Sequence, residues 1–361
     1  MALDLSAGRI LERPDIVSDR YVAHGMPGSL PITVTSPASG TRVTSTTVTV
    51  SGTTTPDASV VAEAAPPTGG AVPIVSTKAD PTTGDWTLTV PVGFATTTIT
   101  VTATLGRSTG YTQTSVVNFT LPGTTLLNDT DPTGDDNGPG TYQYPTSPDF
   151  APGSFDLTDL QVSQTGTDVY VQVKIRNLVP TFGNSFGAQL VDIYVRNPSA
   201  TSFSTSAAYP QLNYGIASNS AWSERLEAQG FASPIWLDAS GTSLGNPEFV
   251  VDDTSGTATL ILPQSTFGTV TSSWVFTVAL TGQNGFNSYQ ARDFTQPAGA
   301  FTFGVCPVGD TAKICSFNPS LVPDVMDTIT PPGVSQDTEL NPTLGSVELQ
   351  GVNGTDTQSG P

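Results

Sequence analysis

The sequence has few basic residues, one histidine and two cysteines, and these shortages exclude several classes of protein. Its 361 residues include 12 Lys and Arg against 31 Asp and Glu, which gives a formal net charge of −19. Such a field repels phosphates, so neither nucleic acid nor an anionic membrane surface is expected as a partner. No run of about 18 or more apolar residues is present, and the sequence therefore predicts no transmembrane segment.

The signatures of common catalytic sites are also missing. His24, the single histidine, lies beside Gly25 in a linker-like stretch, where a rigid Ser-His-Asp triad is not expected. There is no Walker-type phosphate loop and no dinucleotide-binding glycine fingerprint. Carboxylates are plentiful, but no pair is recognisable as the acid and base of a glycoside hydrolase. The sequence therefore predicts a chain without an active site of its own.

Threonine, serine, glycine, proline and valine dominate the remainder. The 35 glycines and 30 prolines follow no period, which excludes collagen. β-branched residues between turn formers predict many short strands and an all-β fold. The acidity could indicate a halophile, but only 12% of the residues are charged, which favours secretion instead. Since the first residues lack the basic and apolar parts of a signal peptide, we expect a fragment of a longer secreted protein.

Two regions of alternating strands are predicted. Residues 31–121 contain short strands at the spacing of an immunoglobulin-like β-sandwich, and Trp86 is expected in its core. After a turn-rich stretch, residues 122–350 fit one larger β-sandwich with long loops. The only candidate helix covers residues 223–229, and residues 351–361 are expected to form a disordered tail.

The two cysteines, Cys306 and Cys315, enclose the turn-forming residues 307–310. A hairpin there could bring the sulfurs together, and the disulfide would add roughly 2–3 kcal/mol of stability by the loop-entropy model. Two unpaired buried thiols are the alternative.

Hard oxygen donors crowd the stretch between the two β regions. Ca²⁺ takes six to eight such ligands, and nearby glycines permit the tight turns that a calcium loop needs. The alternative is that these side chains cap turns through their own backbone. The candidate metal ligands are Asp129, Asp131, Asp135, Asp136 and Asn137.

Sugar-binding modules stack pyranose rings on exposed aromatic side chains. Four aromatic residues lie in or near predicted loops of the second region, and each could instead be buried. These candidate carbohydrate-binding residues are Tyr142, Tyr144, Trp222 and Trp236.

Several long motifs in the second region occur in a recognisable order. They are Asp131 to Thr146 (DPTGDDNGPGTYQYPT), Pro152 to Leu157, Gly183 to Gly187 before the strand Gln189 to Val195, Asp324 to Asp327, and Pro331 to Gln336. Across about residues 125–350 the chain resembles the C-terminal domain of bacterial glucodextranases. That DOMON-like module also occurs in secreted pullulanases, where it is likened to surface-layer anchoring regions.

Two upstream segments extend the resemblance. Val34 to Pro37 and Val48 to Thr54 are similar to the immunoglobulin-like domain that precedes this module in glucodextranase. Ala2 to Tyr21 resembles the segment that leaves a family 15 glycosidase barrel, so residues 1–30 are expected to be the remnant that follows a missing catalytic barrel. The catalytic carboxylates of the family belong to that barrel.

The resemblance implies a secreted or cell-surface, non-catalytic accessory region. Its expected partners are an α-glucan or cell-wall polysaccharide and, in the parent enzyme, its own catalytic barrel. Two other functions remain open at this point. One is glycoside hydrolase activity attributed through the parent, which releases glucose from α-1,6 or α-1,4 glucans, and the other is a spacer without a ligand.

Overall fold

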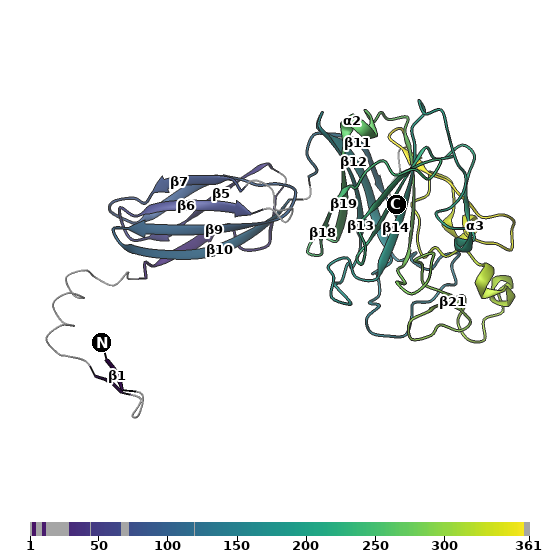
Figure 1. The fold of residues 1–361 in the computed structure, drawn as a ribbon, viewed down its shortest axis with the longest axis horizontal. Coiled ribbons are helices and arrows are strands. Elements are labelled where there is room, and N and C mark those ends of the chain that lie inside the picture. The colour runs from purple at the N-terminus through teal and green to yellow at the C-terminus, as the bar shows by residue number, and fades with distance from the viewer. Residues whose placement is uncertain are drawn as a thin grey trace. The chain divides into compact units, whose positions relative to one another are not determined.

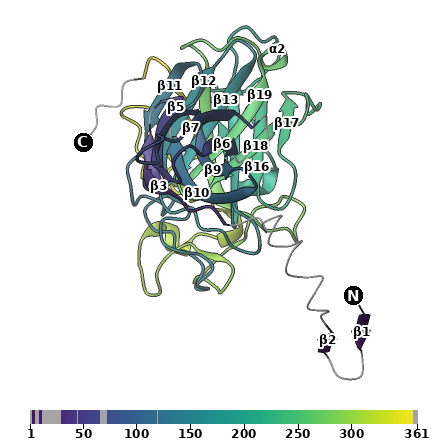
Figure 2. The ribbon, with the colours of Figure 1, turned by 90° about the vertical axis from the view of Figure 1, so that its left-hand side faces the viewer.

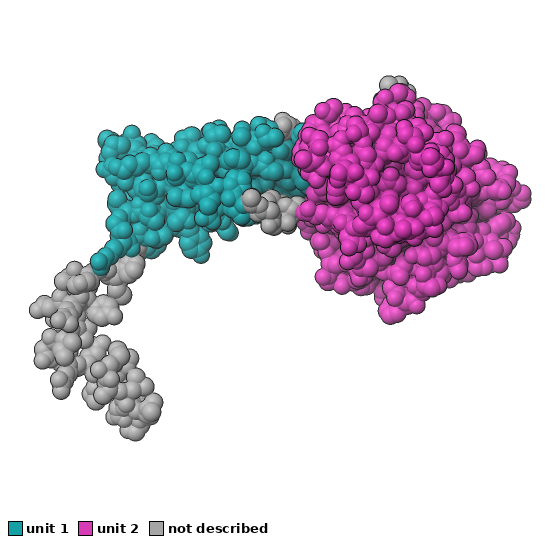
Figure 3. Space-filling model, turned by 45° about the horizontal axis from the view of Figure 1, so that its top comes forward, with its two compact units in different colours: residues 1–120 teal, residues 121–361 magenta. Residues whose placement is uncertain are grey.

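The computed structural model describes residues 2–4, 9–11, 29–43, 45–65, 72–118 and 120–356. The chain divides into two compact units, Met1–Thr120 and Leu121–Pro361 (Figure 3). Both are built almost wholly from strands, so the predicted all-β class is confirmed. In the predicted remnant, β1 (Ala2–Asp4) pairs antiparallel with β2 (Arg9–Leu11). The rest of that segment up to residue 28, His24 included, lies outside the described residues.

The first unit is a β-sandwich of two sheets that cover a shared core. One sheet has the order β3-β5-β8, formed by β3 (Ile32–Ser36), β5 (Thr47–Thr54) and β8 (Asp85–Pro91). The other has the order β4-β10-β9-β6-β7, formed by β4 (Thr41–Val43), β10 (Ser108–Asn118), β9 (Ala95–Leu105), β6 (Ser59–Ala65) and β7 (Ile74–Lys78). Because β4 pairs in parallel with β10 while β3 joins the opposite sheet, the first segment contributes to both sheets, as in immunoglobulin-like folds.

Strict alternation places one face of each strand in this core. In β8, Trp86, Leu88 and Val90 are buried between exposed threonines, as a strand with one solvated face requires. Trp86 packs against the backbone of β5 at Gly52, where an added Cβ would approach its ring to 2.5 Å. The prediction that Trp86 is a core residue is confirmed.

The second unit contains two five-stranded sheets, and Figures 1 and 2 show them from two directions. The first sheet has the order β11-β12-β13-β19-β18, formed by β11 (Thr124–Thr130), β12 (Leu157–Gln164), β13 (Asp168–Ile175), β19 (Thr257–Pro263) and β18 (Glu248–Asp252). The second has the order β17-β16-β14-β20-β24, formed by β17 (Ile235–Asp238), β16 (Glu224–Gln229), β14 (Gln189–Arg196), β20 (Val275–Gly282) and β24 (Val352–Asn353). The main hydrophobic core lies between them.

The second sheet is covered on both faces. Val191, Ile193 and Val195 of β14 belong to the main core, whereas Leu190 and Tyr194 pack in a separate cluster on the opposite face. In Figure 1, the loops that carry β21 (Phe294–Thr295) and α3 (Gln336–Glu339) lie on the side of β14 that faces away from β13 and β19. Continuous burial along β14, β16 and β20 follows from this double cover.

Short elements complete this layer of loops. They are the two-stranded sheets β15 (Gly215–Ile216) with β23 (Glu348–Leu349) and β21 with β22 (Phe303–Gly304), and the helical turns η1 (Pro210–Leu212), η2 (Lys313–Ser316) and η3 (Pro319–Leu321). The short helix α2 (Gln264–Phe267) lies elsewhere, beside β13 and β19 of the first sheet. Among the described residues, none of the helices approaches the length and apolarity that a membrane crossing requires.

The predicted helix at residues 223–229 is wrong, because Glu224–Gln229 forms β16, an interior strand of the second sheet between β17 and β14. Two of its charged side chains, Arg225 and Glu227, are buried in an ionic network with Asp192 of β14. Arg225 Nη1 donates hydrogen bonds of 2.8 Å to Asp192 Oδ1 and to Glu227 Oε2. Burial raises the pKa of Asp192 to about 7, although the Arg225 charge lowers it.

The end of the second unit returns to its beginning. The tail predicted from residue 351 starts too early, since Val352–Asn353 pairs with β20 and Val352 is fully buried. Residues 357–361 lie outside the described residues. Gly354 lies so close to β11 that an added Cβ would stand 2.1 Å from Leu126 O. The first and last strands of the unit are therefore neighbours.

Candidate functional site

An acidic cluster lies where β11 ends and the chain enters the predicted calcium loop. Carboxylate oxygens of Asp131, Asp135 and Asp327 all lie within 4.8 Å of one another. Asp131 comes directly after β11, Asp135 lies in the turn that follows, and Asp327 comes from a segment that bridges to β20 at Leu280. Asp327 is held by the backbone, since Leu157 N and Thr328 N donate hydrogen bonds of 2.7 and 2.9 Å to its two oxygens.

Burial and mutual repulsion make this cluster electrostatically unfavourable. The pKa of Asp131 rises to about 9, chiefly because burial removes its carboxylate from water and then because Asp135 and Asp156 lie close. Burial raises the pKa of Asp135 to about 6 and that of Asp327 well above its ordinary value. Among the described residues, no basic side chain forms an ion pair with any of the three.

Several buried oxygens here have no hydrogen-bond donor. These are Asp129 Oδ2, Asp131 Oδ2, Asp135 Oδ1, Asn137 Oδ1 and Asp156 Oδ1. Buried acceptors without a donor are costly in free energy, and a cation would satisfy them. All of these groups are hard oxygen donors, which suit Ca²⁺ or Mg²⁺ rather than a soft metal.

The structure brings together only part of the predicted ligand set. Asp131 and Asp135 join the cluster, and Asn137 Oδ1 is a buried free acceptor nearby in the chain. Asp129 acts on Asp131 through its charge. Asp136 has a different partner, because its carboxylate accepts the hydroxyl hydrogen bond of Tyr144.

Two acidic residues of this region were not among the predicted ligands. Asp327 supplies the third carboxylate of the cluster, and Asp156 adds a fully buried one whose Oδ2 accepts hydrogen bonds from Gly134 N and Arg176 Nη1. Both lie within sequence motifs that carry the family resemblance. The sequence links Asp156 and Asp327 to the acidic loop only in that these motifs and the loop occur together in the family resemblance.

Three of the four predicted sugar-stacking rings are buried, and this corrects the prediction for Tyr142, Trp222 and Trp236. Only 5%, 6% and 2% of these residues are exposed. Each polar tip is satisfied internally: Tyr142 donates to Pro323 O, Trp222 to Ser206 O and Trp236 to Glu224 Oε2. Buried aromatic residues with satisfied tips are core residues, and no pyranose can reach their faces.

Tyr144 is half-buried, but its ring is enclosed by other rings. It packs against Phe155 at 5.3 Å and Phe303 at 6.4 Å between ring centroids. Its hydroxyl also accepts a hydrogen bond of 2.9 Å from Phe155 N. Through its hydroxyl, Tyr144 therefore links Asp136 of the acidic loop to the backbone at Phe155, which supports a role in holding that loop in place.

Exposed aromatic rings gather instead on loops of the second unit. Phe182 and Phe301 flank the buried Phe150, with ring centroids 6.0 and 6.2 Å from it. The Arg292 guanidinium lies 4.8 Å from the Phe150 ring and donates to Phe301 O. We call Phe182, Phe301 and the Phe150 ring between them the aromatic loop surface.

The backbone at Phe182 is strained. Phe182 has φ +51° and Gly183 φ +84°, in a tight turn closed by the hydrogen bond from Asn184 N to Thr181 O. Two successive positive φ angles favour Asn-Gly, and a bulky side chain at the first position is unusual. Strain of this kind often marks a functional position, and here it presents a ring to solvent.

A polar hollow of about 500 Å³ is lined by residues between Gly333 and Gln350. Its lining includes Glu339 and Asn341 but no aromatic ring. Since a pyranose ring is held largely by stacking, the hollow is less suited to sugar than the aromatic loop surface.

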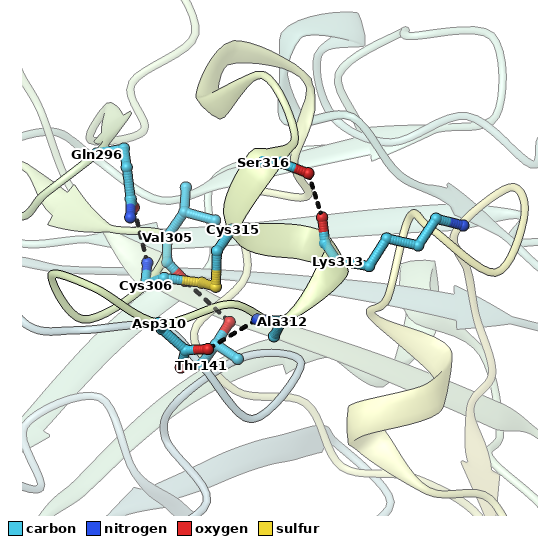
Figure 4. Close-up of a disulfide and its surroundings, with 9 residues drawn as sticks. All are labelled: Thr141, Gln296, Val305, Cys306, Asp310, Ala312, Lys313, Cys315 and Ser316. Carbon is cyan, nitrogen blue, oxygen red and sulfur yellow. Dashed lines mark hydrogen bonds between the residues drawn. A yellow bond between two sulfur atoms is a disulfide. The ribbon is translucent and has the colours of Figure 1, made fainter.

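Cys306 and Cys315 form a disulfide in a loop that is also held by hydrogen bonds between side chains and backbone (Figure 4). Cys306 N donates to Gln296 Oε1 at 2.9 Å, and Thr141 Oγ1 donates to Val305 O at 2.8 Å. The disulfide therefore fixes the loop next to the chain that leaves the acidic cluster. Because both thiols are consumed, the neighbouring Asp310 gains no metal-binding partner from them.

We expect loss of this disulfide to lower the free energy of unfolding of the second unit by roughly 2–3 kcal/mol, because its short loop is no longer constrained in the unfolded chain. The denaturant midpoint of a Cys306→Ala/Cys315→Ala variant would be compared with that of the wild type, with and without reductant. The variant should be insensitive to reductant. If reductant leaves the denaturant midpoint of the wild type unchanged, although thiol titration shows that both cysteines are reduced, the prediction is contradicted.

The family model described as the C-terminal binding-module, SLH-like, of glucodextranase matches residues 126–348. This range starts within β11 and ends at the start of β23, so it includes both sheets of the second unit except β24. It also contains the acidic cluster and the aromatic loop surface. No curated protein sequence matches the chain.

Three solved structures share a limited likeness. An engineered protein is 31% identical over 26% of this chain and 21% of its own, with a TM-score of 0.21. Bacteroides uniformis beta-glucuronidase 3 is 8% identical over 70% of this chain and 23% of its own, with a TM-score of 0.21. Salmonella alpha-2-macroglobulin is 9% identical over 73% of this chain and 16% of its own, with a TM-score of 0.24. The chain thus spans less than a quarter of each of these structures.

Proposed function

Because the chain belongs to the family of SLH-like C-terminal binding modules of glucodextranase, we propose that it binds α-glucan as a non-catalytic accessory region of a secreted or cell-surface glycosidase. A carbohydrate-binding or anchoring role follows from the family itself. The match of a binding module across 126–348 is the observation that carries the proposal. In this proposal the parent enzyme supplies the catalytic barrel, and this chain supplies attachment to the polymer.

The aromatic loop surface is the proposed contact for glucan. Flat apolar rings at loop positions suit the C–H faces of pyranose rings, and Phe182 and Phe301 are each about half exposed on either side of Phe150. A neutral polymer also suits the net charge of −19, which disfavours anionic ligands. The strained turn at Phe182 supports this choice, because the ring occupies a position where asparagine would fit without strain.

Phe182→Asn should weaken retention on glucan while leaving the unit as stable as the wild type or more stable by up to about 1 kcal/mol, because asparagine tolerates the left-handed backbone. Phe301→Ala should also weaken retention. Affinity electrophoresis in gels containing dextran, pullulan or starch measures the effect. A melting curve of each variant separates lost binding from lost folding.

Phe203→Ala is the matched control. Phe203 is exposed to a similar degree, but its ring packs on Arg196 at 4.4 Å rather than on Phe150. Retention should be unchanged in this variant. If wild-type protein migrates freely through every glucan gel, the chain acts as a spacer or binds another cell-surface polymer, and the α-glucan proposal is wrong.

A further inference from the structure

We propose that Asp131, Asp135 and Asp327 bind one structural Ca²⁺ ion that joins the start of the second unit to the segment before its end. The proposal does not depend on glucan binding. It rests on the mutual placement of the three carboxylates and on buried oxygens without a donor.

The spacing of the carboxylates suits a common cation. Two oxygens on opposite sides of a Ca²⁺ ion, each at 2.3–2.6 Å, lie about 4.6–5.2 Å apart. The ligand oxygens of Asp131, Asp135 and Asp327 lie within 4.8 Å of one another, which is in the range of separations between oxygens bound to one Ca²⁺ ion. Asp131 is 8% exposed and Asp327 is fully buried, and Asp131 Oδ2 has no hydrogen-bond partner.

The surrounding backbone holds the ligands in place. Gly138 N donates to Met326 O at 2.8 Å, which ties the acidic loop directly to the segment that carries Asp327. Gln336 Nε2 donates to Asp135 O at 2.6 Å, while its Oε1 accepts from Thr328 N at 3.0 Å. Gly138 has φ +58°, and an added Cβ would approach the Tyr142 ring to 2.2 Å, so the turn requires glycine. A preorganised oxygen site of this kind loses little entropy when it binds an ion.

Calcium fits this chemistry better than other metals. The three donors are carboxylate oxygens without imidazole or thiolate, which disfavours zinc and copper. Mg²⁺ needs near-ideal octahedral geometry and usually keeps several waters, whereas Ca²⁺ accepts irregular sets of six to eight oxygens. The remaining coordination positions are available to backbone carbonyls or water.

The first experiment uses the full wild-type chain. Protein purified without chelator should contain about one equivalent of calcium by elemental analysis. Calcium at about one hundred times its Kd should stabilise the second unit about one-hundredfold over the EDTA-treated protein. For a unit of this size, that corresponds to a melting temperature about 5–10 °C higher.

Asp131→Asn gives a sharper test, because its effect should change sign. In EDTA the variant should melt above the wild type, since a neutral amide costs less free energy to bury beside Asp135 and Asp327 than a carboxylate without a cation. In excess calcium it should melt below the wild type, since the site has lost a ligand. Asp253→Asn, which changes an exposed acidic residue outside the cluster, should melt like the wild type in both conditions.

Two results would overturn the proposal. One is wild-type protein that contains no calcium and melts identically in EDTA and in calcium. The other is an Asp131→Asn variant whose shift is the same in both conditions, because that would be a structural effect without an ion. An equal shift with magnesium alone would overturn the assignment to calcium.

Discussion

Arg225→Met should lower the free energy of unfolding of the second unit by about 3–5 kcal/mol, because it leaves two buried carboxylates without their cation. Arg225 is 4% exposed, and its Nη1 donates to both Asp192 and Glu227. The methionine retains most of the apolar stem, so the loss comes from charge rather than from volume. Chemical denaturation, monitored through the fluorescence of Trp222, Trp236 and Trp274, measures this loss in the free energy of unfolding.

The sign of the pH dependence can be worked out in advance. Burial already holds the pKa of Asp192 at about 7 against an ordinary value of 3.8, and removal of Arg225 raises it further. A carboxyl with a raised folded pKa favours the folded state when protonated, and that contribution is lost as the pH rises. The deficit of Arg225→Met should therefore be small near pH 4 and largest near pH 8.

The control for this prediction removes all three charges at once. Asp192→Leu and Glu227→Met, added to Arg225→Met, should recover most of the loss, because an apolar replacement of a buried ion network is often neutral. Gln229 then keeps Gln283 as a hydrogen-bonding partner. If the triple variant is as unstable as Arg225→Met alone, lost packing rather than unpaired charge explains the effect.

Trp86→Ala should destabilise the first unit by about 3–5 kcal/mol and leave the second unit unchanged. Trp86 is 3% exposed in a small core of mostly Val and Ala side chains, and that core is separate from the two of the second unit. A loss of this size is a large fraction of the stability of a single domain. Calorimetry should show two transitions, of which only one moves.

Trp86→Phe is the matched control. The indole Nε1 of Trp86 is buried without a hydrogen-bond partner, so phenylalanine removes no hydrogen bond and leaves a smaller cavity than alanine. Its transition should shift less than that of Trp86→Ala. A single transition that moves as a whole in both variants would mean that the two units do not unfold independently.

Strands with one solvated face could be predicted from the sequence because their alternation is local. β8 and β13 lie where the alternation of Trp86 to Val90 and of Val169 to Ile175 predicts them. β16 could not be predicted, because its sequence ERLEAQ consists mainly of good helix formers without an alternating pattern. Pairing with β14 and β17 and cover on both faces override that preference, and these contacts are far apart in the sequence.

The candidate site could also be predicted only in part. Asp131 and Asp135 could be found because they share one glycine-containing loop, whereas Asp327 reaches them only through the folded chain. The aromatic prediction failed for a physical reason: position in a loop does not determine exposure. Tyr142 and Trp222 lie in loops that fold back onto the sheets, and Trp236 lies in the strand β17 itself, while Phe182 has a positive φ and is half exposed.

The closeness of Gly354 to Leu126 has a consequence for how the second unit can be connected to other domains. A domain whose two ends meet occupies a single attachment point, so it can be inserted into a surface loop of another protein without pulling that loop apart. Because the two ends are neighbours, they could be joined and the chain opened at another turn without changing the order of the strands in either sheet. The second unit is therefore suited to circular permutation, with new ends placed at a different exposed turn.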